Sequence, residues 1–296
     1  MSMKRSRPIL LATTIALASC GGGGGGGIAS GGTTPPPTPP PPPPPPPPPS
    51  ATFALLLKPV TTDQQFAVAG ASYESTATET PKLGSTEQLQ VRYLASSNTY
   101  EVQLPNSQTW IGLVGKSENE ATGAGGVTLT NQIFNDYGTV FRWSVNGSSV
   151  GIEAAGVATA ASAVPVNGTA TYEAAILGAT SERGSGFSIV DPSVAGSMTL
   201  NFDFGAGTLS GRIVPTLDPE WHDYPLDPLN FRDTVYSTGK TTFSGKFDTS
   251  LSGVNSFEGL FTGTSAQGVI GNLAFPYRSP LNGQTYQAGG AFVGKQ

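Results

Sequence analysis

Eight short runs of alternating apolar and polar residues follow one another between Thr169 and Gly294, and they constrain the fold most strongly. In the clearest run, Met198, Leu200 and Phe202 alternate with small polar residues. Alternation with period two places the apolar side chains on one face of a strand. Eight meandering strands can close into a barrel that side chains fill and that has no exposed edges. The predicted strands are Thr169–Leu177, Ala195–Phe204, Thr208–Val214, Phe231–Ser237, Lys240–Phe247, Asn255–Thr262, Val269–Tyr277 and Tyr286–Gly294.

The preceding part of the chain is also rich in strand patterns. The clearest is a hairpin between Gln88 and Leu104, in which two alternating runs flank the turn Ala95-Ser96-Ser97-Asn98. Charged residues are sparse, and glycine, serine and threonine are abundant, which favours an all-β class. A connector of low apolarity, 156–166, then predicts a β-rich domain at 51–156 followed by a barrel at 157–296. Further strands are expected at Thr52–Leu57, Val127–Thr130, Gln132–Phe134 and Thr139–Val145.

The first twenty residues have the three parts of an export signal. Lys4, Arg5 and Arg7 precede a short apolar run, and Leu-Ala-Ser then leads into Cys20. This cysteine resembles the lipobox of bacterial lipoproteins, so we expect residues 1–19 to be a lipoprotein signal peptide and Cys20 to carry palmitate-type acyl chains. Two or more chains hold a protein stably on a membrane. The alternative is an ordinary signal peptide with a chance cysteine.

Residues 20–50 are expected to form a stalk of low complexity. Seven glycines at 21–27 predict a flexible coil, and eleven prolines at 39–49 predict an extended, semi-rigid helix. The stalk would lift the folded part away from the membrane, although a proline-rich segment can also be a ligand for proline-recognition domains. Because no aspartate follows Cys20, we expect the outer membrane of a Gram-negative bacterium.

Several segments resemble the β-barrel domain of transferrin-binding protein B. They are Gly168-Thr-Ala-Thr-Tyr172, the strand Gly196–Phe204, the turn Gly207–Gly211, the strand Phe257–Gly263 and the end Gly290–Lys295. The resemblance implies a surface lipoprotein with a β-rich handle domain followed by an eight-stranded antiparallel barrel. It also implies non-catalytic binding of a host protein or solute. The chain has room for one such lobe, and smaller relatives bind other host proteins, haem or unknown solutes. A structural outer-membrane lipoprotein without a specific ligand is the other alternative.

Composition and residue inventory point away from catalysis and from nucleic acid. Without residues 1–19 the chain has 12 basic and 20 acidic residues, a net charge of −8. Acidic chains without basic clusters are poor partners for nucleic acid. His222 is the only histidine and Cys20, the only cysteine, is expected to be acylated, whereas nucleophilic triads and zinc sites generally need a histidine or several cysteines. A Ser-His-Asp arrangement through His222 is the catalytic alternative. We therefore expect no catalytic residues, no metal site and no cofactor.

The segment Pro215–Asn230 is the strongest candidate for binding a ligand. It holds Trp221, His222 and Tyr224 among acidic residues and prolines. Long loops on a rigid scaffold often bind, and Trp and Tyr are favoured contact residues. A haem ligand would use His222 or Tyr224 as its axial ligand. In the structural alternative Trp221 covers the end of the barrel, and binding would fall to the handle near Tyr93, Tyr100 and Trp110.

Replacing Cys20 by alanine should abolish acylation and release the protein from the membrane fraction, because the thiol is the expected attachment site. Metabolic labelling with a clickable palmitate, followed by fractionation, measures both effects. Equal label in the wild-type and Cys20→Ala proteins would show that the lipobox assignment is wrong.

Overall fold

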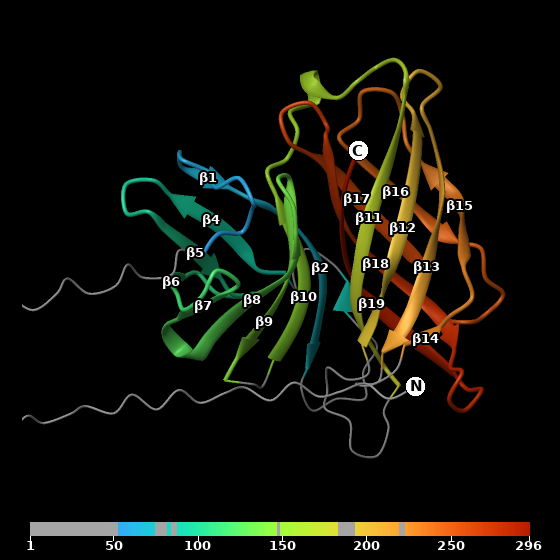
Figure 1. Cartoon of the computed structure of the whole chain (residues 1–296), viewed down its shortest axis with the longest axis horizontal. Helices are drawn as coiled ribbons and strands as arrows, with labels where there is room; N and C mark the ends of the chain where they lie inside the picture. Colours follow the sequence, from blue (N-terminus) through green and yellow to red (C-terminus); the bar gives the residue numbers. More distant parts are fainter. Residues whose placement is uncertain (1–52, 75–81, 84–87, 147–148, 183–192, 219–222) are drawn as a thin grey trace, which may run out of the picture. The chain divides into compact units, whose positions relative to one another are not determined.

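The computed structural model describes residues 53–74, 82–83, 88–146, 149–182, 193–218 and 223–296, so Cys20 and the stalk lie outside the described residues. Residues 48–296 form one compact unit. The described residues form two antiparallel sheets of ten and nine strands, which confirms the predicted all-β class (Figure 1). Their only helices are two 3-10 turns, Ala124–Gly126 and Ala161–Ala163. None of them is long and apolar enough to cross a membrane.

The second sheet closes into a barrel of eight strands, because each strand pairs with the next and the last pairs with the first. All eight predicted runs are strands. The short strand β14 (Tyr224–Pro225) pairs beside β13. The eight are β11 (Thr169–Thr180), β12 (Ser193–Asp203), β13 (Thr208–Asp218), β15 (Leu229–Val235), β16 (Thr242–Phe247), β17 (Ser256–Thr262), β18 (Gly268–Arg278) and β19 (Thr285–Lys295).

Aromatic side chains fill the lumen of the barrel. Phe202 lies at its centre, with ring centroids 4.9 Å from Phe261 and 5.0 Å from Phe243. The alternation along β12 that predicted the strand also places Met198 and Leu200 in this core, fully buried. At the following turn Gly207 adopts φ of 66°, a conformation that residues with a Cβ rarely adopt. The lumen is therefore a packed core rather than a channel.

The first sheet forms the handle, and it also closes on itself. β1 and β2 are consecutive in the chain but lie near opposite edges of the sheet, and the amide of Phe66 between them donates to the carbonyl of Val91 at 3.0 Å. Leu55, Val91 and Phe141 are buried in the handle core. The strands are β1 (Gln64–Gln65), β2 (Ala67–Glu74), β3 (Lys82–Leu83), β4 (Gln90–Leu94), β5 (Thr99–Gln103), β6 (Trp110–Gly115), β7 (Glu120–Gly123), β8 (Val127–Phe134), β9 (Gly138–Val145) and β10 (Ser149–Gly156).

Two details of the predicted handle need correction. The hairpin is confirmed as β4 and β5, but the part of Thr52–Leu57 that is described contains bends and no strand. Leu55 and Leu56 are nevertheless buried, because apolar burial alone does not require sheet pairing. The two strands expected at 127–130 and 132–134 are one strand, β8, with a register shift after Asn131. Such a bulge interrupts the alternation without ending the strand.

An apolar seam joins the handle to the barrel. Ile270, Ala291 and Val293 point outward from β18 and β19 and pack against Val140 and Ile152 of the handle. The two sheets approach closely, since a Cβ added at Gly138 would lie 2.7 Å from Cγ2 of Ile270. The connector adds hydrogen bonds, including Thr159 N to Phe261 O at 2.9 Å. The predicted boundary between residues 156 and 157 stays a prediction, because both halves share this buried cluster.

A buried carboxyl group lies in the handle core. Glu153 on β10 is fully buried and accepts hydrogen bonds from the Trp143 indole at 3.0 Å and the Leu89 amide at 3.2 Å. Burial raises its pKa from 4.5 to about 8, although both hydrogen bonds lower it. Gly70 on β2 is paired with Glu153 on β10. A Cβ added at Gly70 would lie 2.6 Å from the Glu153 side chain. Glycine therefore makes the room that this carboxyl group occupies.

The free energy of unfolding should fall as pH rises from about 4.5 to about 8, because the folded state keeps a proton that the unfolded chain has lost. The slope is at most about 1.4 kcal/mol per pH unit. Glu153→Gln should remove this dependence and stabilise the protein most at the alkaline end. Urea unfolding across this range measures it, with the exposed Glu258→Gln as control. A slope unchanged in Glu153→Gln would contradict the assignment.

Candidate binding pocket at one end of the barrel

The two ends of the barrel differ. Neighbouring strands run in opposite directions, so the loops after β13, β16 and β18 leave the barrel at the same end. At the opposite end the connector contributes Val164 to the lumen core, and the hydroxyl of Tyr172 donates to the carbonyl of Ala266. The lumen is therefore covered at that end by the chain itself, whereas the loops at the other end surround a pocket.

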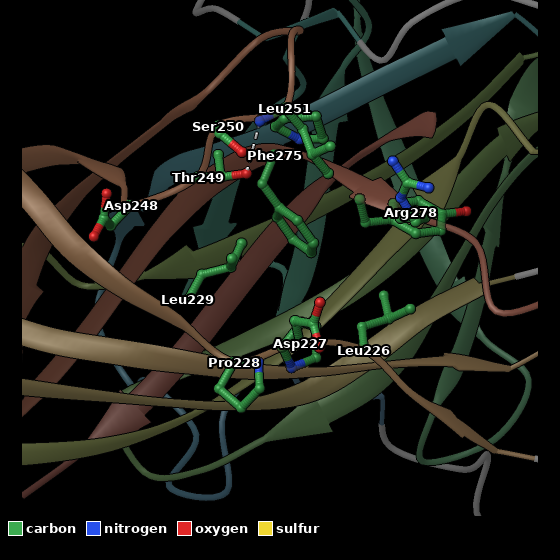
Figure 2. Close-up of a pocket in the computed structure, with 13 residues that line it drawn as sticks. Leu226, Asp227, Pro228, Leu229, Asp248, Thr249, Ser250, Leu251, Phe275 and Arg278 are labelled. Carbon is green, nitrogen blue, oxygen red and sulfur yellow. Dashed lines mark hydrogen bonds between the residues drawn. The ribbon is translucent and has the colours of Figure 1, made fainter. Parts of the chain in front are cut away.

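A pocket of about 430 Å³ lies among these loops (Figure 2). Phe275 is buried beneath it and packs edge-on against Phe247, with ring centroids 5.7 Å apart. Leu226 and Leu229 line the pocket from the loop after β13 and the start of β15. The backbone amide of Leu226 donates to the carbonyl of Pro215 at 3.0 Å, which ties this loop back to β13. The pocket therefore has a packed apolar floor.

Three charged side chains surround the pocket. Asp227, Asp248 and Arg278 are exposed lining residues, and in the described parts of the chain none of their side chains has an ion pair or hydrogen-bond partner. Asp248 is positioned by its backbone, whose amide donates to the carbonyl of Asn230 at 2.7 Å. Figure 2 shows Phe275 between Asp248 and Arg278, so charges of opposite sign flank an apolar centre.

A buried polar cluster supports the wall behind Tyr277. Glu182 is 3% exposed and accepts hydrogen bonds from the Ser279 hydroxyl at 2.7 Å and the Tyr277 hydroxyl at 2.9 Å. Burial raises the pKa of Tyr277 above its usual range; the hydrogen bond with Thr180 lowers it and Glu182 raises it further. The cluster joins the end of β11 to the loop after β18. Within the described ranges, no group of His, Cys, Asp and Glu is arranged to hold a metal ion.

The predicted site residues are only partly described. Trp221 and His222 lie outside the described residues. Tyr224 pairs with Leu217 in the β14 ladder and packs, half-buried, against the lumen core. Of the residues considered in the handle, Tyr93 and Tyr100 are buried. Trp110 is half-buried, with the Arg92 guanidinium 4.0 Å from its ring centroid.

The sequence interpretation missed Asp248, Phe275 and Arg278. They are far from the 215–230 segment in sequence, but the loops after β13, β16 and β18 belong to the same end of the barrel. The signal that could have found them is the alternating direction of antiparallel strands: every second loop of a meander emerges at one end. Counting loops along the eight predicted runs would have placed residues 248–255 and 279–284 beside 215–230.

The chain is similar to several solved structures. Transferrin-binding protein B from Haemophilus parasuis matches at 17% identity and a TM-score of 0.43, covering 77% of this chain and 44% of that one. The protein from Neisseria meningitidis matches at 15% identity and a TM-score of 0.43, covering 77% and 43%. The haemoglobin receptor HpuA from Kingella denitrificans matches at 15% identity and a TM-score of 0.40, covering 81% and 89%.

The chain thus spans less than half the length of the transferrin-binding protein B chains that it matches. Structures of that protein are among the matches, as the resemblance in sequence predicted. No family model and no curated protein matches the sequence.

Replacing Glu182 by alanine should lower the free energy of unfolding by about 1–3 kcal/mol, because it removes the acceptor of buried hydroxyl groups. Urea unfolding measures the change. Glu258→Ala is the control, since Glu258 is exposed on β17 and its loss should have little effect. If the two variants unfold alike, the cluster does not stabilise the wall of the pocket.

Proposed function

We propose that the protein is a non-catalytic binding protein that is held on the outer membrane by acyl chains on Cys20 and contacts its partner with the pocket end of the barrel. The observation that carries the proposal is the pocket over Phe275, which is lined by the loops after β13 and β16 and by the last residues of β18. Exposed loops on a rigid scaffold are a common place for binding residues. The proposed membrane anchor and outer-membrane location rest on the sequence around Cys20.

The packing of the barrel supports binding at its surface. Because phenylalanine rings fill the lumen, a partner can be held at the end of the barrel without any rearrangement of the core. The pocket volume of about 430 Å³ lies in the range usual for ligand sites, roughly 300–1,000 Å³. Prolines at 215, 228 and 276 restrict the backbone of its walls, which reduces the entropy lost on binding.

Two alternatives remain as proposals of lower rank. A haem-binding lipoprotein would need His222 or Tyr224 at the metal, and Tyr224 is half-buried against the barrel core. A structural lipoprotein would need no ligand, and the pocket would then be incidental. Immobilised mature protein can be tested against transferrin, haemoglobin and free haem, which are the first candidates because the resemblance suggests them. Saturable binding of one of the proteins supports the proposal, and haem alone supports the first alternative.

The double variant Trp221→Ala and Tyr224→Ala separates a binding role from a structural one. If the two side chains are anchors, binding of the partner should weaken by about 2 kcal/mol or more. If they only cover the barrel, the melting temperature should fall while affinity is kept. Both quantities are measured on the same protein, and Trp110→Ala is measured beside it as the test of the alternative site in the handle. A lowered melting temperature with intact affinity would remove Trp221 and Tyr224 from the proposed surface.

A further inference from the structure

The charged side chains around the pocket come from three separate segments of the chain. Two carboxylates, Asp227 and Asp248, come from the loop after β13 and the loop after β16, whereas Arg278 lies at the end of β18. Figure 2 places Asp248 and Arg278 on opposite sides of Phe275. The Asp248 carboxylate and the Arg278 guanidinium therefore lie on either side of an apolar centre, and Asp227 lies beside Leu226 and Pro228.

These charges have no partner in the described residues that would neutralise them. Some charges elsewhere in the chain do form pairs, such as Lys58 with Asp136 at 2.8 Å and Lys246 with Asp233 at 3.7 Å. Asp227, Asp248 and Arg278 form no such pair in the part of the chain that the structure describes. A ligand of complementary charge would gain two favourable contacts without displacing an internal ion pair.

Resting on the proposed function, we infer that the pocket takes an exposed segment of a partner protein in which a basic and an acidic side chain flank an apolar one. The apolar side chain lies over Phe275 and between Leu226 and Leu229. The basic side chain faces Asp248, and the acidic one faces Arg278. Electrostatic complementarity of this kind fixes the register of a bound segment and selects against other sequences.

The apolar centre sets the affinity and the charges set the selectivity. Burial of an aromatic or large aliphatic side chain over Phe275 removes apolar surface from water, whatever the rest of the segment is. A segment with two acidic ends would place a like charge beside Asp248. One with two basic ends would place a like charge beside Arg278. Each mismatch is an unfavourable contact in a partly desolvated site.

A phage-displayed library of random linear peptides, selected on the immobilised full mature chain, tests the inference. The wild type should enrich peptides with a basic and an acidic residue on either side of an apolar one. The variant Asp248→Asn should lose the selection for the basic residue and keep the acidic one, and Arg278→Gln should do the opposite. Each variant should bind the wild-type consensus peptide about tenfold more weakly, equal to about 1.4 kcal/mol.

Asp233→Asn is the matched control, because it makes the same chemical change at an exposed aspartate on β15 that does not line the pocket. It should leave the consensus unchanged. Absence of any consensus on the wild type, or the same consensus on all variants, would overturn the inference. If transferrin or haemoglobin binding persists in both pocket variants, the inference is also overturned, but the proposed function stays in place. If the chain binds neither protein and no peptide, both fail together.

Discussion

Strands β18 and β19 carry apolar side chains on both faces, one set in the barrel lumen and the other against the handle. Phe275 and Phe292 point inward, whereas Ile270 and Val293 belong to the seam. The sequence of a strand with one solvated face alternates between apolar and polar residues. The sequences of β18 and β19 are instead nearly continuous apolar runs. Handle and barrel are consequently not two bodies on a linker, because the closing strands of one form the packing surface of the other.

Packing inside the barrel decides where a ligand can bind. Large aromatic side chains fill the lumen, and the connector covers one end through Val164. The remaining end has an apolar floor, a polar cluster around Glu182 behind one wall and charges at its margin. Glu153 shows the opposite use of a carboxyl group, since it is enclosed by the handle core and raised in pKa by that burial. The two buried carboxyl groups lie in different halves, and only Glu182 lies next to the pocket.

Much of the barrel could be predicted from the sequence, because alternation along strands such as β12 reports a single buried face. The handle was harder: β2 and β10 consist largely of alanine and glycine, and these small residues show no alternation although Ala71 and Ala154 are fully buried. Their size allows the close approach of neighbouring sheets, a tertiary requirement that no local pattern reveals. The 215–230 segment was recognised as a candidate site because its aromatic and acidic residues are neighbours in the sequence. Phe275 and Arg278 were not, because only the fold brings them beside that segment.

The grouping of alternate loops at one end of the barrel has a consequence for how such a protein can change over generations. Substitutions around residues 224, 250 and 280 alter a single surface, although they are encoded far apart. None of them needs to disturb the phenylalanine packing or the seam. Selection acting on recognition can therefore proceed separately from selection acting on folding, and a chain of this design can acquire a new specificity while its scaffold stays the same.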